Sequence, residues 1–299
     1  ACQIIFRTLM AMSTRYPLPD LIDPMPKAQA DAPIGIFDSG IGGLSVALEI
    51  AHYLPHERIV YFADTAHVPY GPRSDQEIRE LTAHAIEWLY RQGCKVAVVA
   101  CNTASAFSLD YLRDHYGDNF PIIGLVPALK PAVLNTKTKK VAVLATPATF
   151  RGKLIKDVIA RFAEPARVDV VAVTCLDLVP FVEAGQQMST LCLDTLHKLL
   201  APLIQQGVDH LVLGCTHYPF LKPAIEHLFP AQLTLVDSGL AVARQTARIL
   251  IKHGLLCAQR QETTSQIDCY VSGGNAANLQ PILNHLITTQ MSWTIANLN

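Results

Sequence analysis

Short apolar runs alternate with longer amphipathic stretches along most of this chain. The apolar runs are typical of strands buried on both faces, and they predict strands at 34–37, 59–62, 96–100, 122–125, 141–144, 168–173, 211–213 and 233–236. Between them, apolar positions recur with the helical period, which predicts helices at 44–54, 75–91, 104–115, 150–162, 190–206 and 240–253. Strands that alternate with helices form parallel sheets, so the pattern predicts an α/β protein.

A weak internal repeat divides this pattern into two halves. The matching positions keep an offset that rises slowly from 107 to 114 residues: 36–39 with 143–146, 68–71 with 179–182, and Cys101 with Cys215. The chain, at 299 residues, is also longer than a single hydrophobic core usually supports. We therefore expect two similar α/β halves, preceded by a proline-rich N-terminal extension at 1–32.

The composition of the chain limits its function. The formal net charge is −1 and no basic block could neutralise phosphates, so we expect no nucleic-acid surface. No apolar stretch has the length of a membrane span, and residues 1–12 lack the basic leader of a signal peptide. The eight cysteines show no C-x-x-C and no zinc-like spacing, which favours reduced thiols in a cytoplasmic protein without a metal site.

Two of the cysteines each follow a predicted strand directly. Cys101 lies in the segment VVACNTA, and Cys215 lies in LVLGCTHYP. Ligands of open α/β sheets bind at the carboxyl ends of the strands. Either thiol alone could be a structural cysteine, but both are followed by polar residues: Asn102 and Thr103, or Thr216 and His217. The pair therefore indicates two matched groups that face one substrate.

Two opposed thiols could carry out disulfide redox chemistry or proton transfer on both faces of one carbon. Redox pairs usually lie close in sequence, whereas a thiolate and a thiol on opposite faces would invert a stereocentre. A free cysteine is only a few per cent thiolate at neutral pH, so a neighbouring charge or helix terminus must assist it. His217 could polarise Cys215 or act as an acid. The matched pair favours proton transfer.

Further polar groups lie at the ends of other predicted strands. Residues 38–45 (DSGIGGLS) lack the third glycine of a dinucleotide motif and favour a carboxylate or phosphate pocket, with Asp38 as a helix cap or as a partner of a reacting group. The turn at 68–73 could hold a carboxylate on its amides. Thr146 and Thr149 could bind a carboxylate or cap a helix, and Glu183 could line a cleft or carry a surface charge.

Four segments together resemble the glutamate racemase family of the aspartate/glutamate racemase superfamily: 37–43, 69–71, 100–104 and 214–219. The resemblance extends from about residue 33 to about residue 275. It implies an isomerase that interconverts L- and D-glutamate without a cofactor and supplies D-glutamate for peptidoglycan synthesis. It also implies two flavodoxin-like domains, 33–127 with 237–299 and 128–236, with the active site in the cleft between them.

The resemblance also implies a role for each site residue. Cys101 and Cys215 would be the acid/base groups for opposite enantiomers, assisted by Asp38 and His217, with Glu183 at the family's additional acidic position. Substrate contacts would come from Asp38, Ser39, Tyr70, Gly71, Asn102, Thr103, Thr146, Thr149, Thr216 and His217. These motifs contain no lysine for a Schiff base, so electrostatics in a dry cleft would have to stabilise the carbanion.

Several alternatives and partners stay open at this point. An aspartate racemase would differ in pocket length, and a non-catalytic amino-acid sensor on the same fold would not need both cysteines. A redox protein would need the two Cα atoms roughly 6 Å apart. Family members form dimers in more than one arrangement, so we expect a monomer–dimer equilibrium or a homodimer. Some longer members from Gram-negative bacteria are activated by UDP-N-acetylmuramoyl-L-alanine, although nothing in residues 1–32 indicates a nucleotide site.

Overall fold

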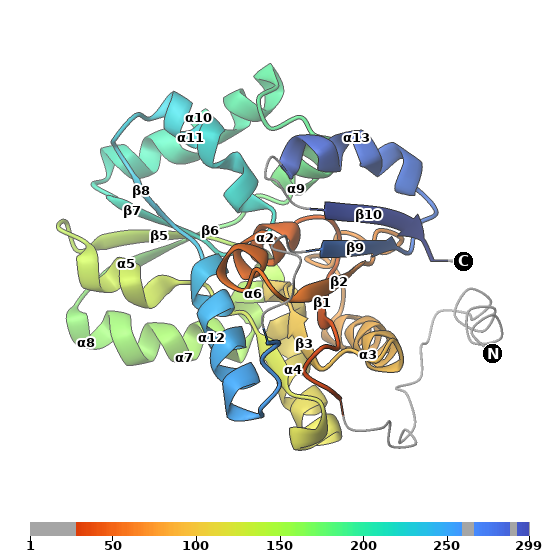
Figure 1. Ribbon diagram of the computed structural model, residues 1–299. Coiled ribbons are helices and arrows are strands. Elements are labelled where there is room, and N and C mark those ends of the chain that lie inside the picture. Colours follow the sequence, from red (N-terminus) through yellow and green to blue (C-terminus); the bar gives the residue numbers. More distant parts are fainter. Residues whose placement is uncertain (1–27, 259–265, 288–291, 299) are drawn as a thin grey trace.

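Helices cover two parallel β-sheets in the computed structural model of this chain, which describes residues 28–258, 266–287 and 292–298 (Figure 1). The predicted α/β class with parallel sheets is confirmed. Our expectations for residues 1–12 and for most of the N-terminal extension concern residues 1–27, outside the described residues. In the part that the structure describes, no helix is both long and apolar enough to span a membrane.

The first sheet has the strand order β10-β9-β2-β1-β3-β4, with all neighbours parallel. Its strands are β1 (Ile34–Asp38), β2 (Arg58–Ala63), β3 (Val96–Val99), β4 (Ile122–Gly124), β9 (Gln266–Val271) and β10 (Ser292–Asn297). Parallel strands bring their carboxyl ends to one edge. The residues that follow β1, β2 and β3 therefore lie side by side.

The second sheet repeats the order of the first without the two C-terminal strands. It runs β6-β5-β7-β8 and consists of β5 (Lys140–Leu144), β6 (Asp169–Val173), β7 (His210–Leu213) and β8 (Thr234–Val236). This order matches β2-β1-β3-β4, so β3 and β7 occupy equivalent central positions. Cys101 and Cys215, which follow these strands closely, lie at equivalent places in the two sheets. The domain boundaries remain a prediction.

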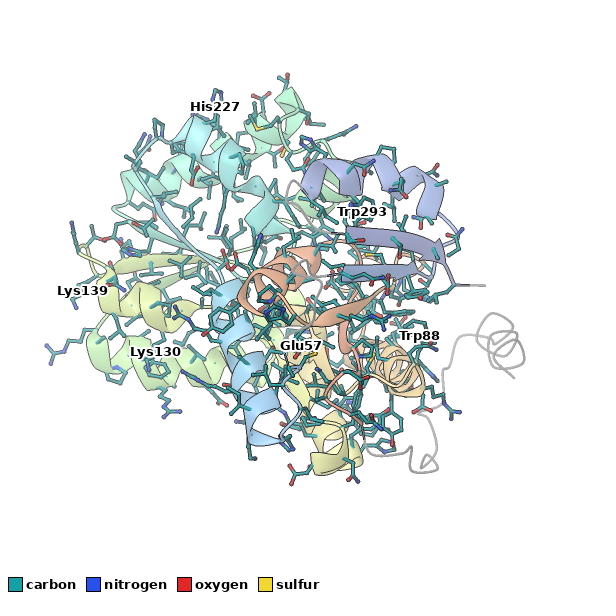
Figure 2. The ribbon with its side chains drawn as sticks, in the orientation of Figure 1. Glu57, Trp88, Lys130, Lys139, His227 and Trp293 are labelled. Atoms are coloured by element: carbon teal, nitrogen blue, oxygen red, sulfur yellow. The ribbon has the colours of Figure 1, made fainter. Side chains whose placement is uncertain are left out.

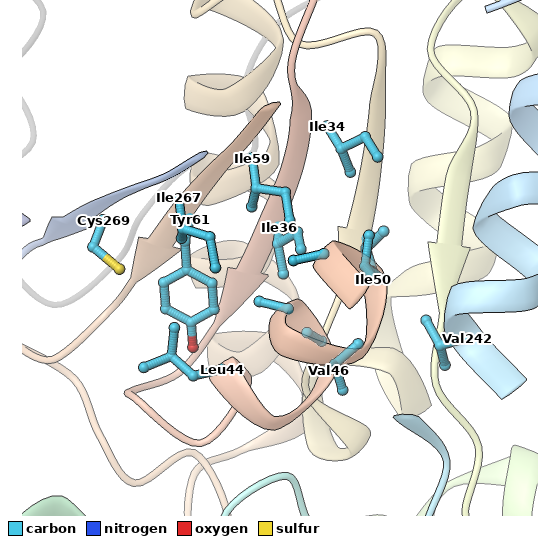
Figure 3. Close-up of a cluster of buried hydrophobic side chains, with 14 of the residues drawn as sticks. Ile34, Ile36, Leu44, Val46, Ile50, Ile59, Tyr61, Val242, Ile267 and Cys269 are labelled. Carbon is cyan, nitrogen blue, oxygen red and sulfur yellow. The ribbon is translucent and has the colours of Figure 1, made fainter. Parts of the chain in front are cut away.

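Alternate residues of the first sheet enter cores on opposite faces, which explains its continuous apolar runs. Ile36 and Val98 pack in one core with helices α2 (Leu44–Tyr53), α12 (Gly239–Lys252) and α13 (Ala276–Leu286). Figure 3 shows part of this cluster, with Leu44 and Ile50 of α2 against the strands. Phe37 and Val99 point the other way, toward α3 (Asp75–Arg91) and α4 (Asn102–Tyr116), which ends in the single turn η1 (Gly117–Asn119).

The central strands β5 and β7 of the second sheet are also buried on both faces, whereas the edge strands β6 and β8 are partly exposed. Leu144 and Leu213 pack with α9 (Leu178–Glu183), α10 (Thr190–Gln205), η3 (Tyr218–Leu221) and α11 (Lys222–Leu228). Val143 and Val212 pack on the opposite face, where α5 (Leu129–Asn135) and α7 (Lys153–Val158) supply apolar side chains. Two-sided burial keeps the strand ends fixed, and this rigidity positions the groups that follow each strand.

The predicted helix at 150–162 is wrong as a single element. The structure has α6 (Pro147–Arg151), α7, the π-helical turn η2 (Ile159–Ala163) and α8 (Glu164–Ala166) in its place. Gly152 interrupts the helix because its backbone is extended and packs on α4, where an added Cβ would lie 2.6 Å from the Cβ of Ala106. Pro165 lies in α8, where it lacks an amide hydrogen to donate to the preceding turn, and the helical segment ends at Ala166.

Strands β9 and β10 were not predicted because they lack continuous apolar runs. Polar and apolar residues alternate in QIDCYV, and only one face of β9 is buried. β10 is the edge strand, and most of its residues are exposed. The short helices α5, α9 and α11 were also not predicted, because six or seven residues show little periodicity.

The chain crosses between the sheets twice, after β4 and after β8. The two crossings lie side by side, since the Ser238 hydroxyl donates to the carbonyl of Val126 over 2.8 Å. This contact holds the two sheets together at one side of the space between them.

A buried ion pair lies at the amino end of the first sheet, away from the carboxyl edge. Lys95, which precedes β3, is fully buried and pairs with Glu57, which is 3 % exposed. Lys95 Nζ also donates to the carbonyl of Ala30, and Glu57 accepts from the amide of Cys257 over 2.9 Å. Figure 2 shows Lys130 and Lys139 at the periphery of the molecule, whereas Glu57 lies inside.

Lys95→Met leaves the Glu57 carboxylate buried without its cation, so we expect it to lower the free energy of unfolding by about 3–5 kcal/mol. Urea unfolding measures this loss. Lys153→Met is the matched control, because Lys153 pairs with Asp157 on the surface, and we expect no measurable shift of its unfolding midpoint. Equal, small effects of both variants would contradict the burial of the Lys95–Glu57 pair.

Candidate active site

A hollow with about 330 Å³ of empty space lies where the carboxyl edges of the two sheets face each other. We call it the central hollow. Its walls come from the segments that follow β1, β2, β3, β5, β6 and β7: Ser39, Pro69, Tyr70, Gly71, Cys101, Asn102, Thr103, Thr146, Leu176, Val179, Cys215, Thr216 and His217. Both sheets therefore contribute residues to one site.

Most of the site residues predicted from the sequence line this hollow, but three do not. Asp38, Glu183 and Thr149 lie behind its walls, and each contacts a lining residue. Asp38 accepts from the Thr216 hydroxyl over 3.3 Å, Glu183 contacts His217, and the hydroxyls of Thr149 and Thr146 are 3.0 Å apart. These three residues can hold lining groups in place, and the structure shows no direct exposure of them to the hollow.

Cys101 is the N-cap residue of α4, and its sulfur faces Ser39. The amide of Ala104 donates to Cys101 Sγ over 3.4 Å, and Sγ lies 3.7 Å from the Ser39 hydroxyl. Burial raises the pKa of Cys101 well above its usual value, and the negative charge of Asp38 raises it further. The Ala104 amide opposes this shift without cancelling it. Cys101 is therefore a neutral thiol at neutral pH.

Asp38 ends β1 and is fully buried behind the hollow. Burial raises its pKa to about 6, although the charge of His217 and the amide of Gly43 act in the opposite direction. The amides of Gly40 and Gly43 donate to Asp38 Oδ2 over 3.2 and 2.9 Å. With a pKa about 2 units above that of a free carboxyl group, Asp38 changes charge close to neutral pH.

Cys215 lies beside the imidazole of His217, whereas Cys101 lies near the carboxylate of Asp38. His217 Nδ1 lies 3.7 Å from Cys215 Sγ, and His217 Nε2 lies 2.6 Å from Glu183 Oε1. Burial lowers the pKa of His217, but its contacts with Cys215 and Glu183 outweigh burial and raise the pKa well above the usual value. The imidazole is therefore protonated at neutral pH and places positive charge beside the Cys215 sulfur.

The glycine loop after β1 gives the Glu183–His217 pair room to approach. An added Cβ at Gly40 would lie 2.1 Å from Glu183 Oε1, and one at Gly42 would lie 2.4 Å from His217 Nδ1. The amide of Ile41 donates to Glu183 Oε1 over 2.9 Å. This loop was predicted to form a carboxylate or phosphate pocket, and the carboxylate that it binds is the protein's own Glu183.

Two more hydrogen bonds join the sheets around the hollow. The Ser45 hydroxyl donates to the carbonyl of Thr216 over 2.9 Å, and the hydroxyls of Thr103 and Thr146 are 2.8 Å apart. Asn102 Oδ1 is buried and has no hydrogen-bond partner within the described ranges, so it is an available acceptor for a bound N–H group.

Sequence reasoning did not select Leu176 or Val179, which form the apolar part of the wall together with Pro69. Apolar residues in loops and short helices carry no chemical signature. The internal repeat gave a signal for Val179, because it pairs the segment containing Pro69 with the segment containing Val179. Across the described residues, no group of three or more His, Cys, Asp and Glu side chains is placed to hold a metal ion.

Three comparisons with known proteins point to the same family. The family model Asp/Glu/Hydantoin racemase matches residues 45–246. The glutamate racemase of Deinococcus radiodurans is 52% identical over 261 residues, which cover 87% of this chain and 88% of that protein. Among solved structures, a glutamate racemase isoform from Bacillus anthracis superposes with a TM-score of 0.77 at 30% identity, covering 90% of this chain and 99% of that one.

The crystal structure of Escherichia coli glutamate racemase in complex with L-glutamate and the activator UDP-MurNAc-Ala is also similar. Its TM-score is 0.75 at 35% identity, with 89% of this chain and 98% of that chain covered. These identities are high enough to show a shared family as well as a shared fold.

Glu183→Gln should lower the pKa of His217, because it removes a negative charge that contacts Nε2. Imidazole NMR signals followed over a pH titration measure this change, and the other histidines serve as internal references. Protonation of His217 stabilises the fold fully below the unfolded pKa of about 6.5, and this contribution is lost as pH rises through the raised folded value. An unchanged His217 titration in Glu183→Gln would mean that the pair does not form.

Proposed function

Since the chain belongs to the Asp/Glu/Hydantoin racemase family, we propose that it interconverts L- and D-glutamate by a two-cysteine, two-base mechanism without a cofactor. One observation carries the proposal. Cys101 and Cys215 are free thiols that follow equivalent strands of two sheets with the same order, and both line the central hollow. A reaction that must reach both faces of one carbon needs such a pair of opposed groups.

Glutamate in the central hollow would place its α-carbon between the two sulfurs. The thiolate of one cysteine takes the α-proton and becomes a thiol, while the thiol of the other cysteine gives its proton to the opposite face. The configuration inverts, and the two cysteines exchange protonation states. Enantiomers have equal free energies, so kcat/KM is the same in both directions and each cysteine is needed for both.

The surroundings of the two cysteines assist this exchange in different ways. The protonated His217 favours negative charge on Cys215. Cys101 begins as a thiol, and Asp38 lies near enough for its charge to act on that thiol. Because Asp38 has a pKa of about 6, it can hold or release a proton when Cys101 changes state.

Donors around the hollow would hold the two carboxylates of glutamate. Hydroxyls of Ser39, Thr103, Thr146 and Thr216 belong to the lining segments, and the Tyr70–Gly71 turn adds backbone amides. The free Asn102 Oδ1 suits the α-ammonium group. Hydrogen bonds to the α-carboxylate strengthen as negative charge develops on deprotonation, and the buried setting makes them more effective.

Replacing either cysteine by serine should lower racemisation of both enantiomers by about 10²–10⁴-fold, the usual contribution of a general acid or base. The measurement is incubation with L- or D-glutamate in D₂O, followed by circular dichroism and α-deuteration by NMR. Each serine variant should retain some α-deuteration without inversion for one enantiomer only. Cys101→Ser and Cys215→Ser should differ in which enantiomer that is. Cys257→Ser, a half-buried thiol outside the hollow, is the matched control and should behave as wild type.

The outcomes separate the competing functions. Full racemisation by either serine variant would exclude the two-base mechanism. No exchange of glutamate by the wild-type protein, but exchange of aspartate, would identify an aspartate racemase. Binding of glutamate without exchange, unaffected by either substitution, would identify a sensor.

The rate should depend on pH through Asp38. We expect kcat/KM of the wild type to rise through about pH 6 as Asp38 loses its proton, and Asp38→Asn to abolish this limb. The pKa of Asp38 is higher in the folded state than its value of 3.8 in the unfolded state. Protonated Asp38 therefore contributes its full stability below pH 3.8, and this contribution is lost as pH rises through about 6.

Near pH 8, Asp38→Asn should therefore have a free energy of unfolding up to about 3 kcal/mol above that of wild type, and it should unfold at a higher urea concentration. Near pH 3, the two proteins should differ little. A pH–rate profile and urea unfolding at both pH values measure the two effects. An ascending limb that persists in Asp38→Asn would assign it to another group.

The resemblance of the motifs and the similar proteins also support a biological setting. We propose that the protein acts in the cytoplasm and supplies D-glutamate for peptidoglycan synthesis and hence for cell shape, as a homodimer or in monomer–dimer equilibrium. Activation by UDP-N-acetylmuramoyl-L-alanine is supported by the similar Escherichia coli structure, which contains this activator. Adding the compound to the racemisation assay tests this regulation directly.

A further inference from the structure

Asp64 lies outside the central hollow, yet three side chains from two segments contact its carboxylate. It follows β2 directly and is 4 % exposed. Its oxygens accept from the Tyr70 hydroxyl over 2.6 Å and from the Ser272 hydroxyl over 2.7 Å, and His67 Nδ1 lies 2.8 Å away. A carboxylate this deeply buried needs such partners, so its surroundings are tied to it.

One of these partners forms part of the wall of the hollow. Tyr70 is 1 % exposed, and its ring packs against Phe37 with centroids 6.1 Å apart. Burial raises the pKa of Tyr70 well above its usual value, and the Asp64 charge raises it further, so the hydroxyl stays a neutral donor. The bond to Asp64 therefore fixes the side chain on which the 69–71 turn rests.

The backbone next to Tyr70 has little room to move. An added Cβ on Gly71 would lie 2.8 Å from Leu176 Cδ2 and 3.3 Å from Thr146 Cβ, both in the second sheet's part of the wall. The turn thus spans the gap between the sheets at close range. A shift of the turn would change the width of the hollow and the direction of the amides that line it.

The C-terminal part of the chain holds Asp64 from the other side. Ser272 follows β9, which pairs with β2 in the first sheet (Figure 1). Its hydroxyl donates to Asp64 and accepts from the amide of Ala66 over 3.0 Å. The amide of Gly273 donates to the Thr65 hydroxyl over 3.0 Å. Residues more than 200 positions away in the sequence therefore fix the turn that carries Asp64.

We propose that Asp64 is a positioning residue for the Tyr70–Gly71 wall of the substrate site, and that strand β9 supports this wall through Ser272. The inference rests on the proposed function, because it takes this wall to contact glutamate. It gives the added C-terminal strands a role beyond completing the sheet: they determine the geometry of a substrate-binding turn.

Three substitutions, each removing one contact, test the proposal: Tyr70→Phe, Asp64→Asn and Ser272→Ala. We expect KM for both enantiomers to rise about 10-fold, with kcat changed less than about 3-fold, because a charge-assisted hydrogen bond in the binding wall is lost and both cysteines are unaffected. Thr294→Ala is the matched control. It removes the hydroxyl–carboxylate bond from Thr294 on β10 to Asp268 on the neighbouring strand β9, and its kinetic constants should match wild type.

Hydrogen exchange of the substrate-free protein provides a readout that does not depend on activity. In Asp64→Asn and Ser272→Ala, exchange of the amides that residues 69–73 carry, those of Tyr70, Gly71 and Arg73, should accelerate at least about 10-fold, while the strands of both sheets keep their protection. Uniform acceleration throughout the first sheet would indicate general destabilisation and overturn the proposal. Unchanged exchange at 69–73, or unchanged KM despite local acceleration, would overturn it as well.

The two proposals fail in distinguishable ways. If the wild-type protein does not racemise glutamate, the proposed function is wrong, whatever the variants do. Local acceleration at 69–73 would then still establish Asp64 as the residue that positions the turn. If the wild type is active and the variants behave like Thr294→Ala in both measurements, only the positioning role is lost.

Discussion

The two sheets can meet around the central hollow because the loop after β1 has no side chains at Gly40 and Gly42. Added Cβ atoms there would occupy the positions of Glu183 and His217. Without them, the second sheet places its carboxylate and imidazole directly against the backbone of the first. A single oxygen of Glu183 then accepts from both the Ile41 amide and His217. The position of the imidazole beside Cys215 thus depends on the first sheet as well as its own.

Equivalent positions in the two sheets have acquired different electrostatic surroundings. Cys101 and Cys215 follow corresponding strands, but Asp38 faces the first and the protonated His217 assists the second. The pair is therefore symmetric in geometry and asymmetric in charge. Such asymmetry suits a proton exchange between opposite faces of one carbon, since one group must begin protonated while its counterpart accepts the proton.

The site concentrates buried ionisable groups at one edge of each sheet, which is costly for stability. Packing on both faces of both sheets compensates, and the buried Lys95–Glu57 pair holds the opposite end of the first sheet. Strand β3 connects the two ends of the first sheet: Lys95 of the ion pair precedes it, and Cys101 of the site follows its carboxyl end. The C-terminal strands contribute in a similar way, with Ser272 linking β9 to the turn behind the hollow.

Hydrophobic periodicity by itself determined the α/β class, the eight strands β1 to β8 and most of the long helices, because buried strands leave continuous apolar runs. The positions of Cys101 and Cys215 just after such runs also predicted a site at the carboxyl edge, where the central hollow lies. Strands β9 and β10 escaped detection because polar residues interrupt their apolar positions: only one face of β9 is buried, and most of β10 is exposed.

Only the tertiary structure showed that Glu183 reaches His217 and the glycine loop, and that Leu176 and Val179 close the wall. These contacts join residues far apart in the sequence. Local periodicity carries no information about such pairs, because their geometry depends on how the two packed sheets dock.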